Sequence, residues 1–284
     1  MTRINWPGAR TAATEFWWFG LKEARACVFA GSFFAVLLLS RVVPLGDVPR
    51  YDAILIGALL LQAAMLWTKL ETRDELAAIC LFHLFGFALE VFKTNPAIGS
   101  WSYPEPGYSK LFGVPLYSGF MYAAVASYMI QAWRLFDLEV TGTPPARVAV
   151  PIALLIYVNF FTHHFIGDYR WWLAGLLMLA YRRTWVRFTP HRVRCAMPLV
   201  LSFALIGFFV WIAENIATSL RAWTYPNQAH GWNPVHHGKI SSWMLLVVIT
   251  FTVVAALKRR KAEAGQGVDG AAFPQPEPGT RSMP

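Results

Sequence analysis

Two short segments of the sequence carry acidic, hydroxyl and aromatic residues in the same order. The first begins at Glu90 and reads EVFKTNPAIGSWSYP, and the second begins at Glu214 and reads ENIATSLRAWTYP. Each segment has a Glu that closes an apolar run, a Thr one helical turn later, and then Trp-Ser/Thr-Tyr-Pro. The same order in two distant segments predicts an internal duplication.

The two Glu residues are the first candidates for chemistry. A carboxylate inside a membrane helix is costly, so Glu90 and Glu214 need either a function or a partner. The functional interpretation makes them the acid and the base of one site. The alternative is structural: Glu90 would pair with Lys93 or cap Thr94, and Glu214 would pair with Arg221.

The aromatic residues of both segments are predicted to line a pocket, namely Trp101, Tyr103, Trp223 and Tyr225. Rings held next to a proline form rigid walls, which suit a flat apolar ligand or a developing cation. The alternative is that they anchor the chain at the membrane interface, where Trp and Tyr are enriched. Polar neighbours are predicted to contribute to substrate binding: Thr94, Asn159, Asn215 and Thr218.

Histidines form a further group of candidates. His163 and His164 precede Asp168, and His236 and His237 lie in the last segment before the final apolar run. We predict catalytic roles for the first three residues and substrate contacts for the second pair of histidines. All five are also candidates for a divalent metal such as zinc or iron, since His and carboxylate at such spacings bind these ions. The alternative is that they form hydrogen bonds in interfacial loops.

Composition places these residues in a membrane protein. Hydrophobic residues make up 56% of the chain and charged residues 14%, whereas soluble domains average about a quarter charged residues. The Lys and Arg residues behind the net charge of +9 lie beside apolar segments, as membrane topology requires. Nucleic-acid binding is therefore not expected. Three cysteines are too few and too scattered for a disulfide framework.

The expected fold is an all-α polytopic transmembrane bundle of about eight helices. A span needs about 20 apolar residues, and the candidates are 24–43, 51–68, 76–92, 114–135, 148–165, 168–185, 197–217 and 239–257. They form one membrane domain, 24–258, with two tandem four-helix halves, 24–135 and 148–257. The sixth segment has a short apolar run, so it either tilts little, with Arg182 and Arg183 snorkelling, or is re-entrant.

The flanking segments differ from the apolar core. Residues 1–23 are expected to form either an amphipathic interfacial helix or a partly ordered tail. Residues 259–284 are first basic and then rich in Gly and Pro, and we expect them to be disordered. Most of the 25 Lys and Arg residues fall on the side that holds both termini, so both termini are predicted to be cytoplasmic. Membrane lipids are the expected partners.

Several motifs carry a resemblance over roughly residues 15–258. The sequences FKTNPAIGSWSYPE, GVPLYSGFMYAAVASY, NFFTHHF, DYRWW and HHGK together resemble the YoaT-like family of bacterial integral membrane proteins, domain of unknown function 817. The resemblance implies a multi-pass protein of the bacterial cytoplasmic membrane. Locally, Gly-Ser-Trp-Ser-Tyr with a later Gly-Val-Pro is similar to membrane carotenoid cyclases and hydratases, whose acids protonate an isoprenoid double bond. Those cyclases have paired acids after this proline, whereas Leu116, Tyr117 and Ser118 follow Pro115 here.

The sequence thus favours a membrane-embedded enzyme or binding protein for an apolar, isoprenoid-like or lipid substrate. No nucleotide or redox cofactor is implied, because no phosphate-binding or dinucleotide motif is present. A transporter or channel for a small solute or ion is the alternative, favoured by the repeat and the intramembrane polar residues. A metal-dependent membrane enzyme and a purely structural membrane protein are further alternatives.

Overall fold

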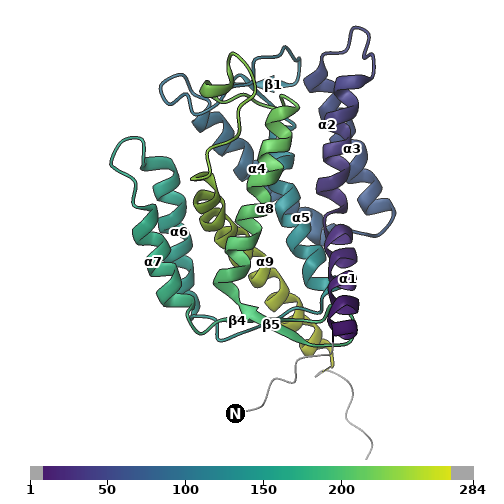
Figure 1. The fold of residues 1–284 in the computed structure, drawn as a ribbon, viewed down its shortest axis with the longest axis vertical. Coiled ribbons are helices and arrows are strands. Elements are labelled where there is room, and N and C mark those ends of the chain that lie inside the picture. The colour runs from purple at the N-terminus through teal and green to yellow at the C-terminus, as the bar shows by residue number, and fades with distance from the viewer. Residues whose placement is uncertain (1–8, 270–284) are drawn as a thin grey trace, which may run out of the picture.

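The computed structural model describes the backbone of residues 9–269 and the side chains of residues 10–258. This part of the chain is mostly helical, with nine α-helices (Figure 1). They are α1 (Ala9–Ala26), α2 (Val28–Val42), α3 (Arg50–Trp67), α4 (Arg73–Lys93), α5 (Ser118–Leu135), α6 (Ala146–Thr162), α7 (Arg170–Tyr181), α8 (Leu199–Ser219) and α9 (Lys239–Asp269). A 3₁₀ turn, η1, covers Pro226–Gln228.

Four of the described helices are long and apolar enough to cross a membrane: α3, α4, α8 and the Lys239–Lys258 part of α9. The pair α1–α2 would be a fifth span, although it bends by 61°. Helix α6 is apolar but shorter, and α7 has only 12 residues, about 18 Å at 1.5 Å per residue. The chain is therefore a multi-pass membrane protein with four to five candidate spans by length and composition.

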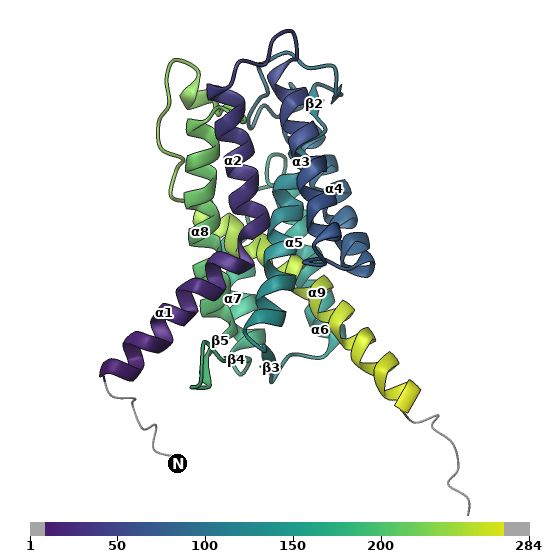
Figure 2. The ribbon, with the colours of Figure 1, turned by 90° about the vertical axis from the view of Figure 1, so that its right-hand side faces the viewer.

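Helix α1 bends away from the axis of α2 (Figure 2). It docks on the chain segment around His191. The Glu15 carboxylate accepts the backbone N–H groups of His191, Arg192 and Val193 at 2.9–3.1 Å. The Lys22 ammonium donates to the Thr189 carbonyl at 2.8 Å. Residues 1–23 were predicted to form either an interfacial helix or a partly ordered tail. The structure has a helix from Ala9 onward, and residues 1–8 lie outside the described part. The break at Cys27 divides the predicted first span, 24–43.

Two small antiparallel sheets depart from the all-α prediction. Strands β3 (Glu139–Thr141), β4 (Trp185–Phe188) and β5 (Cys195–Pro198) form one sheet, and β1 (Lys110–Leu111) and β2 (Val114–Pro115) form the other. In β4 only Val186 is buried between exposed neighbours, the period-two pattern of a half-buried strand. Strands therefore take residues from three predicted helical segments: 114–135, 168–185 and 197–217. Backbone groups that lie outside a helix still need hydrogen-bond partners, and strand pairing supplies them.

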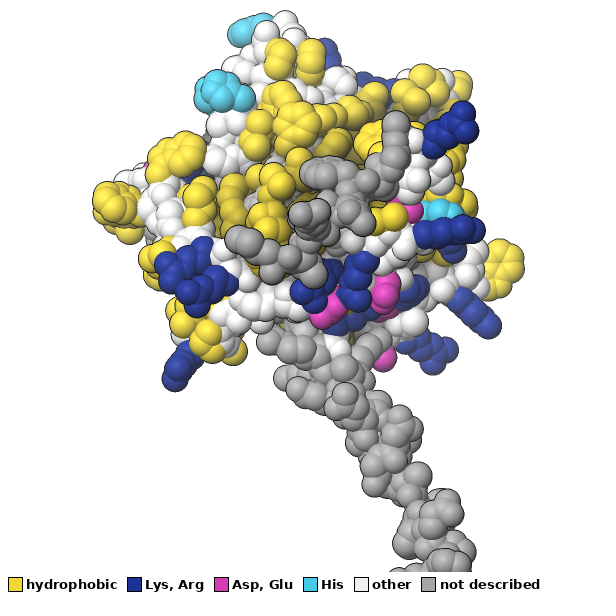
Figure 3. Space-filling model, turned by 60° about the horizontal axis from the view of Figure 1, so that its bottom comes forward, with side chains coloured by type: hydrophobic (Ala, Val, Ile, Leu, Met, Phe, Trp, Pro, Cys, Tyr) yellow, Lys and Arg dark blue, Asp and Glu magenta, His cyan; other side chains and the backbone are white. Residues whose placement is uncertain are grey.

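From α2 to α9, successive helices run in opposite directions along the long axis of the molecule, which has two distinct ends (Figure 1). The loop end holds residues 43–49, 94–117, 163–169 and 220–238. The basic end holds β3, β4 and β5 and the ends of the described chain. Exposed arginines gather at the basic end, which Figure 3 brings forward: Arg147, Arg182, Arg183, Arg187, Arg192 and Arg194. Helix α9 continues to Asp269, and the rest of the predicted tail lies outside the described residues.

Helix packing follows the same scheme in the two predicted halves. Helix α2 packs on α3 and α5, and α6 packs in the same way on α7 and α9. The most extensive helix pairs are α4 with α5 and α8 with α9, and α5 and α9 meet each other between the halves. Both extensive pairs approach closely at a glycine. A Cβ on Gly119 would lie 2.6 Å from the His83 carbonyl oxygen, and one on Gly207 would lie 2.9 Å from that of Ile240.

Candidate functional site

Glu90 accepts three side-chain hydrogen bonds near the end of α4. Its Oε2 accepts the Trp101 indole N–H at 2.6 Å and the Tyr103 hydroxyl at 2.7 Å. Its Oε1 accepts the Tyr122 hydroxyl of α5 at 2.7 Å. Glu90 is 2% exposed, so the carboxylate is satisfied inside the protein by aromatic donors. It makes no ion pair with Lys93.

Glu214 occupies the corresponding place near the end of α8. Its Oε1 accepts the Tyr225 hydroxyl, and its Oε2 accepts the Trp243 indole N–H of α9 at 2.8 Å. Tyr122 and Trp243 therefore play the same part in the two halves, each on the helix that follows its aromatic segment. Neither proposed ion pair, Glu90 with Lys93 or Glu214 with Arg221, forms.

The two aromatic segments pair with each other. Ser102 and Thr224 form an isolated antiparallel bridge, in which each N–H donates to the other's carbonyl at 2.9 Å. These residues occupy equivalent positions between Trp and Tyr, so their reciprocal contact is the kind that a local two-fold axis generates. Beside the bridge, the rings of Trp101 and Tyr225 meet edge to face at 5.9 Å. The bridge fixes these two rings side by side.

A cavity of about 950 Å³ lies on the other side of these rings, between α4, α6, α7 and α9. Trp101 and Tyr225 form part of its wall, and three cationic side chains line it: Lys93, Arg170 and Lys239. The Lys239 ammonium lies 5.1 Å from the Trp101 ring centroid and 4.8 Å from that of Tyr225, within the range of cation–π attraction. No hydrogen bond or ion pair reaches this ammonium from the described residues.

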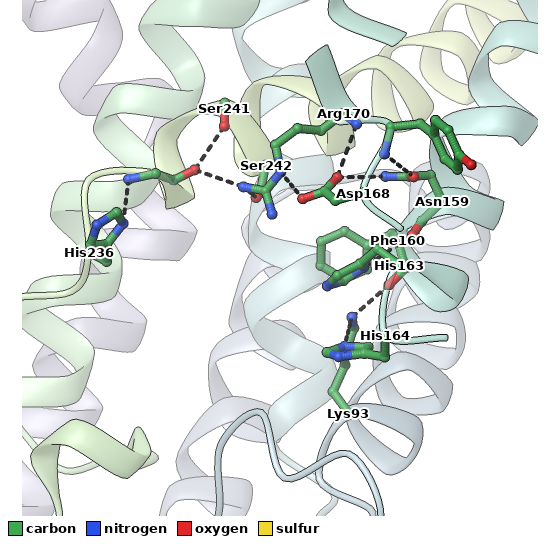
Figure 4. A network of polar contacts seen from close by, with 12 residues as sticks. Lys93, Asn159, Phe160, His163, His164, Asp168, Arg170, His236, Ser241 and Ser242 are labelled. Carbon is green, nitrogen blue, oxygen red and sulfur yellow. Dashed lines mark hydrogen bonds and ion pairs between the residues drawn. The ribbon is translucent and has the colours of Figure 1, made fainter. Parts of the chain in front are cut away.

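Asp168 is the one carboxylate in the cavity lining, and Arg170 holds it. The Arg170 Nε donates to Asp168 Oδ2 at 2.5 Å, while the Arg170 Nη1 makes only long contacts, to the Gly238 carbonyl at 3.4 Å and the Ser242 hydroxyl at 3.3 Å (Figure 4). Partial desolvation acts to raise the pKa of Asp168, but donors from Arg170 and Asn159 hold that pKa below its usual value. Asp168 is therefore a charged, partnered residue.

Lys93 ends α4 and turns toward α6, as Figure 4 shows. It is 2% exposed, and its ammonium donates to the Phe160 carbonyl at 2.6 Å and contacts His164 Nε2 at 2.9 Å. Since an ammonium only donates, this His164 nitrogen is an acceptor. Desolvation and the neighbouring Lys93 charge lower the pKa of His164 to about 4. The same two causes lower the pKa of His163.

Melting temperature against pH tests this arrangement. A histidine whose folded-state pKa lies below its unfolded value takes up its proton more readily when unfolded, so its contribution to stability is full above about pH 6.5 and is lost toward pH 4. The wild type is expected to lose stability across that window. His164→Gln keeps an acceptor that does not titrate, so its curve should fall less steeply. Parallel curves for the wild type and His164→Gln would show that the contact with Lys93 does not lower the pKa of His164.

Comparison with known proteins identifies the relatives of this chain. The family described as "Protein of unknown function (DUF817)" matches residues 15–251. The chain belongs to the DUF817 family. It is 55% identical over 246 residues to "Uncharacterized protein YoaT" of Bacillus subtilis (strain 168), an alignment that covers 87% of this chain and 92% of that protein. No solved structure matches the chain.

In this DUF817 protein, the sequence-predicted site residues fall into two groups. One group lines the cavity: Trp101, Asn159, His163, His164, Asp168, Tyr225, His236 and His237. The other group does not line it: Glu90, Thr94, Tyr103, Glu214, Asn215, Thr218 and Trp223. Thr94 and Thr218 donate to the carbonyls of Glu90 and Glu214 one turn earlier. Asn215 accepts the Val235 N–H at 2.9 Å, so it braces the loop.

The predicted metal candidates do not converge. Within the part of the chain that the structure describes, no group of three or more His, Cys, Asp or Glu side chains is arranged to hold a metal ion. Asp168 is engaged by Arg170, and His236 Nδ1 accepts the Gly238 N–H at 3.0 Å. His236 and His237 stack on each other with ring centroids 4.3 Å apart.

Sequence reasoning missed the roles of five residues of this DUF817 protein. Lys93, Arg170 and Lys239 supply the cations of the cavity, and Tyr122 and Trp243 complete the glutamate networks. A signal for the cations was present in the sequence, because all three lie on the side predicted to be translocated, where Lys and Arg are disfavoured. Tyr122 and Trp243 gave no such signal, since their spacing from Glu90 and Glu214 differs between the halves.

Proposed function

We propose that this DUF817 protein binds an anionic amphiphile in the cavity at the loop end. The observation that carries the proposal is the charge of the lining: three cationic side chains face one carboxylate, and that carboxylate is already paired with Arg170. A cation removed from water is costly unless a counter-charge accompanies it. The nearly buried Lys93 makes no ion pair, and the Lys239 ammonium lies over two rings and makes no ion pair with a described residue.

The rest of the cavity wall suits an apolar chain. Ile156, Phe160, Trp171, Ile240, Met244 and Leu245 line it together with the cations. A cavity of about 950 Å³ lies in the size range of small-molecule sites. An anionic head with an apolar tail therefore matches both parts of the lining, which narrows the expectation of an apolar, isoprenoid-like or lipid substrate to one with an anionic head.

The proposed topology has eight membrane helices, α2 to α9, as two tandem four-helix halves. Their alternating directions and matched packing support this arrangement, and the short α7 pairs with α6 as a hairpin. The arginine-rich basic end is assigned to the cytoplasm by the positive-inside rule. The cavity then opens on the outer side of a bacterial cytoplasmic membrane, and both termini are cytoplasmic.

Glu90 and Glu214 act as positioning residues in this proposal, not as the acid and base. Each is at most 4% exposed, and neither lines the cavity. Their hydrogen bonds hold Trp101 and Tyr225, the rings over which Lys239 lies. They thus fix the wall and the cation that a ligand would meet.

Binding is favoured over a continuous pore by the inner boundary of the cavity. Ile156 and Leu245 line the cavity and also belong to the main hydrophobic core, where they are 2% and 4% exposed. That core includes side chains from α4 to α9 and reaches Val254 near the basic end. A packed apolar core of this kind at the inner boundary of the cavity favours a closed site over a pore.

The experiment is equilibrium binding to the purified protein in nanodiscs, with decanoate, decyl phosphate, decanol and decyltrimethylammonium as probes. The proposal predicts binding of an anionic probe and none of the cationic one. Lys239→Met should weaken anion binding about 10- to 100-fold, the effect of losing one charge-assisted contact. Arg221→Met is the matched control, because Arg221 is exposed at the same end and outside the cavity. Equal binding of anionic and cationic probes would refute the proposal.

A further inference from the structure

The two halves differ at one pair of equivalent arginines. Arg50 is the first residue of α3, and Arg170 is the first residue of α7. The helices correspond because α2 with α3 and α6 with α7 are the first two helices of each half and pack as hairpins. The aromatic segments of the halves correspond through the Ser102–Thr224 bridge.

In the first half, the guanidinium of Arg50 is fully engaged. Its Nη1 donates to both carboxylate oxygens of Glu105 at 3.0 and 3.1 Å. Its Nη2 donates to the Leu220 carbonyl at 2.8 Å, and its Nε donates to the Ser40 hydroxyl at 3.0 Å. Arg41 adds a second ion pair to Glu105 at 3.1 Å. A carboxylate of the chain itself therefore lies between two arginines.

In the second half, the corresponding carboxylate is missing. Glu105 directly follows the Trp101–Pro104 segment, and the residue that directly follows Trp223–Pro226 is Asn227, which is neutral. Arg170 uses its Nε for Asp168, makes only long contacts with Nη1, and makes no hydrogen bond through Nη2 to the described residues. Arg170 instead lines the cavity together with Lys93 and Lys239, and Asp168 is the one described carboxylate of that lining.

We propose that the cavity binds a carboxylate headgroup, held by Arg170 and Lys93, as the counterpart of Glu105 in the first half. Arg170 presents free N–H groups, and planar guanidinium–carboxylate pairing is the geometry that Arg favours. Lys93 adds charge from α4, and the apolar lining receives the tail, so the ligand is a long-chain carboxylate. This inference rests on the proposed function and names the chemistry of its ligand.

The test supplies a carboxylate from the chain beside Arg170. The Ser242 hydroxyl lines the cavity and lies 3.3 Å from Arg170 Nη1, so Ser242→Glu should pair with the guanidinium and weaken decanoate binding to the nanodisc protein at least tenfold. Ser242→Gln, of the same length but neutral, should bind decanoate at least tenfold more tightly than Ser242→Glu does. Equal decanoate binding by the two variants, or tighter wild-type binding of decyl phosphate than of decanoate, would overturn the inference.

A second variant tests the first-half site. Glu105→Ala removes the internal carboxylate from Arg41 and Arg50 and should lower the melting temperature. Acetate should restore part of that loss, and chloride at the same ionic strength should not. No difference between acetate and chloride would contradict carboxylate recognition by this arginine arrangement. Failure of the wild type to bind any anionic probe would refute the proposed function instead, and the acetate result would still be measurable.

Discussion

Glu90→Gln is expected to lower the melting temperature by about 10 °C. The carboxylate accepts hydrogen bonds from Trp101, Tyr103 and Tyr122, and hydrogen bonds to a charged acceptor contribute about 1.5–3 kcal/mol each. Gln keeps one acceptor oxygen but turns an amide N–H₂ toward the same donors. We expect a net loss of about 3 kcal/mol in the free energy of unfolding. For a chain of this size, each kcal/mol lowers the melting temperature by roughly 2–4 °C. Thermal unfolding of the purified protein measures the change.

Glu139→Gln is the matched control for this substitution. Glu139 pairs with Arg187 and Arg194 at the basic end, but 46% of its side chain is exposed, so the change should cost less than about 1 kcal/mol. Glu214→Gln should behave like Glu90→Gln with a smaller loss, because Glu214 accepts two donors instead of three. If Glu90→Gln unfolds at the wild-type temperature, Glu90 does not organise the aromatic wall.

Gly207→Val is expected to disrupt the second half. A Cβ at Gly207 would lie 2.7 Å from the Met244 backbone nitrogen and 2.9 Å from the Ile240 carbonyl oxygen, so α8 and α9 would have to separate. Separation moves Trp243 away from Glu214 and displaces Lys239, which begins α9. Overpacking costs about 1–3 kcal/mol or more, so the variant should lose both stability and anion binding, as measured by thermal unfolding and decanoate titration.

Gly175→Ala provides the comparison, since a Cβ at Gly175 in α7 meets nothing within 4 Å. It should keep wild-type binding and gain a little helix stability. Wild-type behaviour of Gly207→Val would show that α8 and α9 tolerate separation, contrary to the close approach described above.

Much of the fold was predictable because it depends on local sequence properties. Apolar length located α3, α4, α8 and the Lys239–Lys258 part of α9, the four helices long and apolar enough to span. The Glu, Trp, Tyr and Pro order located the two segments that meet at Ser102 and Thr224. The strands were not predictable in the same way. Segments such as Trp185–Phe188 are short, and their pairing with Cys195–Pro198 depends on contacts that no local pattern specifies.

The site was predictable only in part. Eight predicted site residues line one cavity, whereas the predicted acid and base, Glu90 and Glu214, do not; the eight are Trp101, Asn159, His163, His164, Asp168, Tyr225, His236 and His237. The role of Lys93 was missed because its proximity to Glu90 in the sequence favours a local ion pair, whereas tertiary packing turns its ammonium toward Phe160 and His164. Likewise, the donors to Glu90 and Glu214 include Tyr122 and Trp243, which come from neighbouring helices.

Photo-crosslinking with a diazirine-bearing long-chain fatty acid, followed by peptide mass spectrometry, tests the binding of an anionic amphiphile in this cavity most directly. The predicted labels fall on cavity residues of α6, α7 and α9, including Phe160, Trp171 and Met244, and excess decanoate should compete them away. Lys239→Met should reduce this labelling and Arg221→Met should not. Labels spread over the lipid-facing helices and unchanged by decanoate would contradict the proposed site.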